Sequence, residues 1–441
     1  MRKFSSIAAI AGLLFGYDTG IISGAIFFIK SSFLLSIFMT EIVVGIVLLG
    51  AVFGSICSAR LINVVGRRNI IEVDAILFMV STLCSALAPT IEVLLLGRIG
   101  VGFAIGIACY VVPLYISELA PARYRGSLVA LNTIAVTGGI FISYLIGYLL
   151  SSTESWRWML GLGVVPAGIL WFGVQFLPES PRWLVKQGKV AEANKLLRLT
   201  RETTEEADLE MVAIQEGLKQ TDSCWKELFT SPVRKLLIIG VVLAAIQQVT
   251  GINTILYYAP LLFQSIGFKS VSALMLLTLG VGFINFLMTI FVMLRVDKVG
   301  RRSLLLWGLF GMTASLTVLS FSLRCNFEST LVVWSTVLSL FAFVAAYASS
   351  IGCIFWIVIA EIYPLNVRGL AMGIASAANW GVNLVITLTF LTLLNALGPS
   401  NTFFCYCLAC AASFIFCYRY LPETAKRSLE EIESTVYSGE S

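Results

Sequence analysis

Long apolar stretches recur along nearly the whole chain, and charged residues gather in the short segments between them. Each stretch has close to the about 20 residues that an α-helix needs to cross a hydrocarbon core about 30 Å thick. The pattern therefore predicts twelve transmembrane helices. Their expected ranges are 7–29, 42–62, 70–89, 93–117, 127–150, 158–177, 236–263, 272–295, 303–323, 331–360, 370–394 and 401–420. The first range lacks a small-residue cleavage site, so we interpret it as a retained span.

The composition agrees with this pattern, since 58% of the residues are hydrophobic and only 12% are charged. Such values are typical of an all-α integral membrane protein. With both termini in the cytoplasm, the outer loops hold few basic residues, namely Lys30, Arg157, Lys269 and Arg324. This asymmetry fits the positive-inside rule. We therefore interpret the net charge of +5 as a topology signal and predict no nucleic-acid partner.

One long charged stretch, at 178–235, interrupts the apolar pattern. Within it, 190–199 and 205–218 have the periodicity of amphipathic helices lying on the cytoplasmic side. The stretch divides the chain into parts, and the predicted parts are a six-helix half at 1–177, a linker at 178–235, a second six-helix half at 236–421 and a cytoplasmic tail at 422–441.

Three motifs of the first half recur in the second. Gly-Arg-Arg at 66–68 recurs at 300–302, and Pro-Glu at 178–179 recurs at 422–423. A Glu stands seven residues before an Arg-Gly pair in both halves, at Glu118 and at Glu361. Such internal duplication is typical of secondary transporters, whereas a channel or a membrane enzyme has no particular need of it.

The repeated charges predict a latch, because Arg–carboxylate forks between the two halves would hold the cytoplasmic side shut. The alternative is that they are solvated loop charges that only fix the topology. The predicted gating charges are Arg67, Arg68, Glu118, Arg125, Glu179, Asp297, Arg301, Arg302, Glu361, Arg368 and Glu423.

Asp18 interrupts the first apolar stretch near its midpoint. A carboxylate in the apolar core of a membrane costs several kcal/mol, so it is retained where it has a partner or a function. The chain contains no His, so any proton would have to be carried by a carboxylate, and we expect Asp18 to be the deepest one. Its expected partner is Arg98, about six residues into the fourth span. The alternative is a structural pair that never changes.

Seven motifs occur in order along the chain. They are GYDTG at 16–20, GR at 97–98, PLYISELAP at 113–121 with RG at 125–126, PESPRW at 178–183, QQVTGIN at 247–253, DKVGRR at 297–302 and PET at 422–424. With them the chain resembles the sugar porter family of the major facilitator superfamily, and most of all its bacterial proton-coupled symporters for galactose, arabinose and xylose. The resemblance implies two pseudo-symmetric six-helix halves that work as a monomer in a plasma membrane, as in a bacterial inner membrane.

Three departures from the family pattern occur. The first loop motif, NVVGRR at 63–68, lacks the basic residue that is common two places before its Gly. Thr133 stands where the fifth helix usually carries a sugar-binding Gln, which leaves the preferred sugar open. Cys353 stands where a Pro is common before the Trp of the tenth helix, which points to altered gating there. Animal glucose facilitators usually carry Asn at the position of Asp18, whereas this chain keeps a titratable residue.

Neutral amides and aromatic residues occur at membrane depth in the seventh, eighth, tenth and eleventh helices. Amides suit sugar hydroxyls because each offers donors and an acceptor, and aromatic rings pack on the apolar face of a sugar. Gly251 interrupts the seventh helix, as expected where a broken helix lines a cavity. The alternatives are that the amides hold helices together and that the rings only pack. The predicted substrate-binding residues are Gln247, Gln248, Asn253, Tyr257, Tyr258, Asn285, Trp356, Trp380, Asn383, Thr133 and Phe15, with Asn379 on the face of Asn383.

The sequence thus predicts import of a monosaccharide together with a proton by alternating access. The alternatives are a facilitator of sugars or polyols that ignores protons, and a sugar sensor without transport. An enzyme is disfavoured because the amide set offers no nucleophile, paired carboxylates or metal ligands. We expect no cofactor and no metal site, and interpret Cys407 and Cys410 as packing residues.

Overall fold

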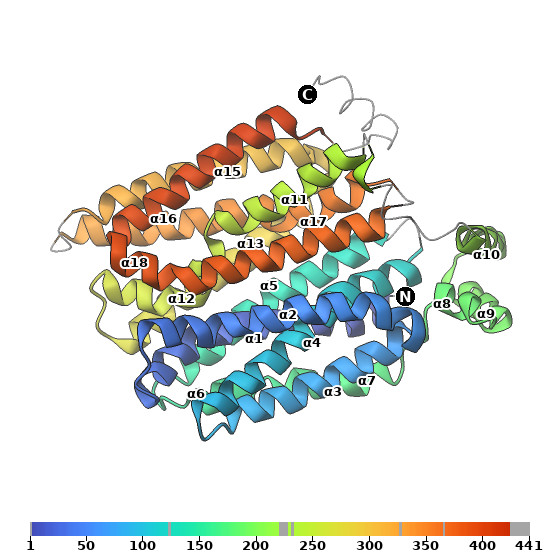
Figure 1. Ribbon diagram of the computed structural model, residues 1–441, viewed down its shortest axis with the longest axis horizontal. Helices are drawn as coiled ribbons and strands as arrows, with labels where there is room; N and C mark the ends of the chain where they lie inside the picture. The colour runs from blue at the N-terminus through green and yellow to red at the C-terminus, as the bar shows by residue number, and fades with distance from the viewer. Residues whose placement is uncertain are drawn as a thin grey trace. The chain divides into compact units, whose positions relative to one another are not determined.

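The computed structural model describes residues 2–121, 125–219, 228–230, 233–325, 329–364 and 367–423, and within these ranges it contains helices and turns but no β-strand (Figure 1). The helices are α1 (Arg2–Ser32), α2 (Ile37–Val65), α3 (Arg67–Ala86), α4 (Ile91–Leu119), α5 (Arg125–Leu149), α6 (Trp156–Gly161), α7 (Val164–Val174), α8 (Pro181–Lys186), α9 (Val190–Thr200), α10 (Thr204–Lys219), α11 (Val233–Val249), α12 (Ile252–Ser265), α13 (Val271–Met293), α14 (Val296–Val299), α15 (Arg301–Ser322), α16 (Thr330–Ala348), α17 (Ile351–Ile362) and α18 (Arg368–Tyr420).

Eleven helical segments of the described chain are long and apolar enough to cross a membrane. The last of them, α18, covers two predicted spans. It is broken at Gly398, whose φ of 78° and ψ of 159° are not helical. Pro399 follows and has no N–H with which to continue the helical hydrogen bonding. α18 therefore contains two spans joined at this break, and the all-α fold with twelve spans is confirmed.

Three other predicted spans are divided in the structure. The span expected at 331–360 consists of α16 and α17. Gly251 has a φ of 85° and separates α11 from α12, as its position in the seventh span predicted. The span expected at 158–177 consists of α6 and α7, which were predicted as one helix. Pro166, in the first turn of α7, cannot donate to the carbonyl of Leu162, and this missing bond explains the interruption.

The described helices cluster into two compact units. Unit 1 comprises Met1–Asp18, Leu49–Gly139 and Leu160–Asp222, and unit 2 comprises Thr19–Leu48, Ile140–Met159 and Ser223–Ser441. Within unit 1, α3 packs against α4 and α7, whereas in unit 2 α15 packs against α16 and α18 (Figure 1). The helices α1, α2 and α5 each contribute one part to each unit. The predicted division into halves at the charged stretch stays a prediction.

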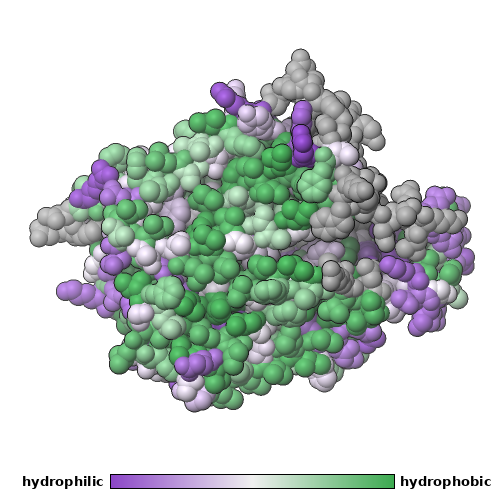
Figure 2. Space-filling model, viewed as in Figure 1, coloured by the Kyte–Doolittle hydropathy of each residue, from purple (hydrophilic) through white to green (hydrophobic). Residues whose placement is uncertain are grey.

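The helix surfaces carry many exposed apolar side chains, among them Phe172, Trp307 and Phe310. On the face drawn in Figure 2, hydrophobic residues cover most of the long helices, while hydrophilic residues gather at helix ends and over α8 to α10. Apolar surface of this kind is suited to contact with lipid. The amphipathic helices expected in the charged stretch are α9 and α10, and α9 buries Ala193, Leu196 and Leu197 on one face.

Candidate functional site

Asp18 and Arg98 form a buried ion pair in unit 1. Nη1 of Arg98 on α4 lies 2.5 Å from Oδ1 of Asp18 on α1, and the two residues are 1% and 6% exposed. Among the described residues, Nε and Nη2 of Arg98 have no hydrogen-bond partner. The pair therefore rests on one charge-assisted hydrogen bond and not on a two-pronged fork. The structure thus brings together the two residues that the sequence paired, whereas their role in proton coupling stays a prediction.

Two further carboxyl groups are shielded from solvent at least as completely as that of Asp18, whose depth in the membrane stays a prediction. Asp74 on α3 is 2% exposed and Glu41 on α2 is 0% exposed. Oδ1 of Asp74 has no hydrogen-bond partner in the described part of the chain. Asp74 lies within the span predicted at 70–89, whereas Glu41 lies one residue before the span predicted at 42–62.

Four predicted amides form a chain of hydrogen bonds in unit 2. Nδ2 of Asn379 donates to Oε1 of Gln247 at 2.7 Å, and Nε2 of Gln248 donates to Oδ1 of Asn379 at 2.9 Å. Nδ2 of Asn253 donates to Oε1 of Gln248 at 2.6 Å. The chain joins α11, α12 and α18 and reaches α17 through the carbonyl of Ile351, which accepts from Gln247 at 3.3 Å. Asn379 and Gln248 are its two inner members, although Asn379 was predicted only as a neighbour of Asn383.

The aromatic residues and Asn383 surround a second polar contact of unit 2. The hydroxyl of Tyr258 donates to the carbonyl of Thr387 at 3.2 Å, and the hydroxyl of Thr387 donates to Oδ1 of Asn383 at 3.2 Å. The Tyr258 ring stacks on Phe390 with centroids 5.4 Å apart. Trp356 is half-buried. The remaining predicted residues of this unit are buried, namely Tyr257, Asn285 and Trp380.

The other predicted substrate contacts, Phe15 and Thr133, belong to unit 1, and both are half-buried. Cys353, the departure on the tenth span, lies in unit 2 with its sulfur 3.3 Å from the carbonyl oxygen of Ala348. Their roles remain predictions.

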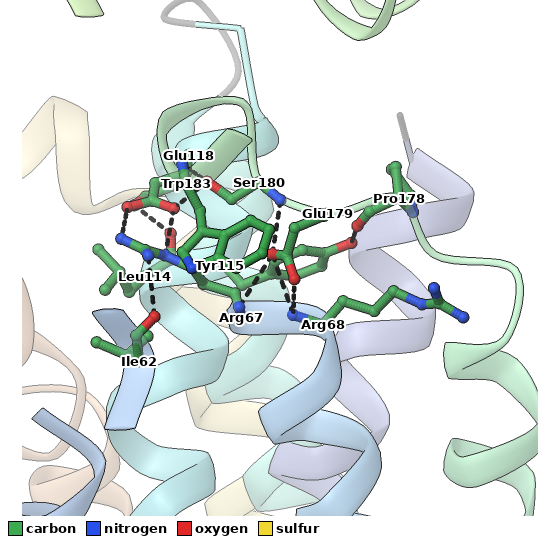
Figure 3. Close-up of polar contacts among 11 residues, drawn as sticks. Ile62, Arg67, Arg68, Leu114, Tyr115, Glu118, Pro178, Glu179, Ser180 and Trp183 are labelled. Carbon is green, nitrogen blue, oxygen red and sulfur yellow. Dashed lines mark hydrogen bonds and ion pairs between the residues drawn. The ribbon is translucent and has the colours of Figure 1, made fainter. Parts of the chain in front are cut away.

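A fork of charges joins α3 to α4 within unit 1 (Figure 3). Nε and Nη2 of Arg67 each donate to one carboxylate oxygen of Glu118 at 3.0 Å, and Nη1 donates to the carbonyl of Ile62 at 3.1 Å. The hydroxyl of Ser180 donates to the same carboxylate. Such two-pronged contacts fix geometry as well as charge.

The Glu179 carboxylate accepts hydrogen bonds from the backbone at the start of α3. It accepts the N–H groups of Arg67 at 2.9 Å, Arg68 at 3.2 Å and Ser180 at 2.8 Å. Gly66 has a φ of 94°, which favours glycine, and a side chain there would meet the Glu179 carboxylate. Burial raises the pKa of the Glu179 carboxyl, although the three backbone donors act in the opposite direction.

The second half repeats this arrangement in unit 2. Nη2 of Arg301 lies 3.0 Å from Oε1 of Glu361. Glu423 accepts the backbone N–H groups of Arg301 at 2.9 Å and Arg302 at 3.1 Å. Gly300 has a φ of 93° and faces the Glu423 carboxylate. The sequence repeat is thus also a repeat of contacts, in which Glu361 corresponds to Glu118 and Glu423 to Glu179.

These contacts correct the expected location of the forks. Arg67 and Glu118 both belong to residues 1–177, and Arg301 and Glu361 both belong to 236–421. The described ion pairs therefore join helices of one half, whereas the sequence predicted Arg–carboxylate forks between the halves. A repeated pattern alone does not distinguish a contact within each copy from a contact between copies.

Three further predicted gating charges are Arg368, Arg125 and Asp297. Nε of Arg368 donates to the carbonyl of Tyr363 at 3.1 Å. The side chains of Arg125 and Asp297 lie outside the described residues. Ser180 was not predicted as a contributor, although it follows the repeated Pro-Glu pair directly.

We expect Glu118→Gln to destabilise the protein by about 3 kcal/mol, because removing one partner of a buried ion pair leaves the other charge uncompensated. Thermal unfolding in detergent checks this. The control is Glu192→Gln, which alters a pair with Lys189 at 4.0 Å whose side chains are 64% and 53% exposed. It should change stability by less than about 0.5 kcal/mol. Equal shifts in the two variants would contradict the prediction.

Comparison with known proteins gives matches along nearly the whole chain. A family model described as "Sugar (and other) transporter" matches residues 4–436. The D-xylose transporter of Levilactobacillus brevis is 40% identical over 99% of this chain and 97% of its own length. The galactose-proton symporter of Escherichia coli (strain K12) is 38% identical over 98% of this chain and 94% of its own.

Solved structures also match nearly the whole chain. A partially occluded, inward-open structure of the xylose transporter XylE from E. coli has a TM-score of 0.85 at 29% identity and covers 97% of this chain and 99% of its own. A structure of the major facilitator superfamily proton:xylose symporter XylE bound to 6-bromo-6-deoxy-D-glucose has a TM-score of 0.82 at 30% identity, with 98% of each chain covered.

Proposed function

Because the chain belongs to the sugar transporter family and has the major facilitator fold, we propose that this membrane transporter imports a monosaccharide together with a proton by alternating access. The sugar is a hexose or a pentose. The curated relatives whose names give a substrate include a D-xylose transporter and a galactose-proton symporter. The observation that carries the proposal is the buried pair of Asp18 and Arg98.

Proton coupling follows from what such a pair does when its geometry changes. A neighbouring guanidinium favours the charged carboxylate, whereas an apolar surrounding without a counter-charge favours the neutral acid. A rearrangement that alters the Asp18–Arg98 contact therefore alters the affinity of Asp18 for a proton. Because Asp18 is held by a single hydrogen bond, a small displacement of α1 against α4 suffices.

The sugar site is proposed at the amide chain of Gln247, Gln248, Asn253 and Asn379. Their mutual hydrogen bonds orient the four amides. The NH2 groups of Gln248 and Asn253 each make one of these bonds and can make a second donation, whereas that of Asn379 also donates to the carbonyl of Ala244. A bound sugar then meets donors of fixed direction, which limits the entropy lost on binding. Tyr258 and Asn383 extend this polar set along α12 and α18.

The proposed state of the molecule is closed at the outer ends of the helices. The similarity to an inward-open XylE structure supports this assignment. The distribution of Lys and Arg supports cytoplasmic termini. On this orientation, the Arg67 and Arg301 clusters lie at the cytoplasmic ends and brace each half as it moves.

The purified protein in liposomes tests the proposal. An inward proton gradient should drive uptake of at least one sugar from a panel of galactose, glucose, arabinose, xylose and inositol, and a protonophore should abolish its accumulation. Downhill flux that ignores the gradient would favour a facilitator. Binding without any flux would favour a sensor.

A further inference from the structure

Glu41 is a carboxylate without a counter-charge at the start of α2. It is 0% exposed, and none of the ion pairs found among the described residues involves it. Both of its oxygens are nevertheless occupied. Oε1 accepts the backbone N–H of Thr392 on α18 at 2.8 Å, and Oε2 accepts the hydroxyl of the same residue at 2.7 Å. One residue therefore donates to both carboxylate oxygens, and each bond is of the strong, charge-assisted kind.

The contact between α2 and α18 continues for a further turn of both helices. A side chain at Gly45, four residues after Glu41, would meet the side chains of Leu388 and Thr387. The glycine thus allows the two helices to approach closely. Because α2 belongs to the first half of the sequence and α18 to the second, this contact joins the halves, unlike the ion pairs of Arg67 and Arg301.

The same turn of α18 carries the polar contacts proposed to bind sugar. Thr387 accepts the hydroxyl of Tyr258 at its carbonyl and donates its own hydroxyl to Asn383. Thr392 lies five residues further along α18. A change in the position of Asn383 or Tyr258 therefore acts on the stretch of helix that Glu41 holds.

We propose that Glu41 is the latch of the outer gate, and that sugar bound at Asn383 and Tyr258 strengthens its contact with Thr392. Alternating access requires the outer ends of the two halves to separate, and this pair must break when they do. The link to sugar rests on the proposed function, whereas the latch itself does not. Glu41 is a positioning residue that need not touch the substrate.

The test measures how often the outer end opens. Leu388→Cys is introduced, and its reaction with a membrane-impermeant maleimide added from outside is followed by mass on the peptide that contains position 388. Adding Glu41→Gln should raise the labelling rate about tenfold, which corresponds to about 1.4 kcal/mol, because the NH2 group that replaces one carboxylate oxygen cannot accept a hydrogen bond from Thr392. Thr392→Val keeps the backbone donor and should raise the rate about threefold. The double variant should not exceed Glu41→Gln, since both changes break one contact.

Thr389→Val is the matched control, because the Thr389 hydroxyl bonds within its own helix to the carbonyl of Val385 at 2.8 Å. It should leave the labelling rate unchanged. Sugar should slow labelling with Glu41 intact and have no such effect in Glu41→Gln. Unchanged labelling in both Glu41→Gln and Thr392→Val would overturn the latch. Faster labelling of these variants in a protein that moves no sugar would retain the latch and reject the proposed function.

Discussion

Asp18→Asn is expected to exchange sugar across a liposome membrane without accumulating it. With one proton per sugar, a gradient of 2 pH units supports a concentration ratio of about 100, since each unit is worth about 1.36 kcal/mol. Asn is close in size to the neutral acid and cannot release a proton. The variant should therefore still change conformation with sugar bound, and its ratio should fall to about 1.

The matched control for this experiment is Asp74→Asn. Asp74 is also buried in a membrane span, but it has no ion-pair partner among the described residues, so its neutralisation should leave accumulation intact. Arg98→Gln should resemble Asp18→Asn in losing accumulation. Continued sugar accumulation by Asp18→Asn would reject Asp18 as the coupling residue. Loss of accumulation in Asp74→Asn would instead assign proton coupling to Asp74 on α3.

The sequence was sufficient for the membrane fold, because hydrophobic length is dictated by the thickness of the bilayer. It also located the break at Gly251, where glycine adopts a φ that other residues avoid, and it ended one span at 394 and began the next at 401, on either side of Gly398. The pairing of Asp18 with Arg98 was also predictable, because two opposite charges inside membrane spans find few other groups with which to pair.

Contacts that depend on side-chain direction were harder to predict. The repeat at 66–68 and 300–302 identified the charged residues, but the ion pairs with Glu118 and Glu361 form within each half. Glu41 was missed because its partner is an N–H group and a hydroxyl of Thr392, neither of which stands out in a sequence as a counter-charge. A search for every carboxylate within a predicted span and its margins would have found both Glu41 and Asp74.

Asn379→Ala is expected to weaken sugar binding about 10- to 100-fold. Asn379 donates to Gln247 and accepts from Gln248, so its loss leaves two buried amides without their orienting partner. A loss of about 1.4–2.8 kcal/mol is equivalent to two hydrogen bonds of ordinary net strength. Calorimetric titration with the sugar found in the transport panel measures the change.

The same variant distinguishes the two explanations of the amide chain. If the amides bind sugar, Asn379→Ala lowers the affinity of the folded protein for sugar, beyond any effect of its lower thermal stability. If they only hold helices together, the unfolding temperature falls while the affinity of the folded protein stays at the wild-type value. Asn401→Ala provides the control on the same helix, because Asn401 is exposed and its amide bonds to the carbonyl of Leu397 at 2.9 Å. Wild-type affinity in Asn379→Ala would therefore move the sugar site away from this chain of amides.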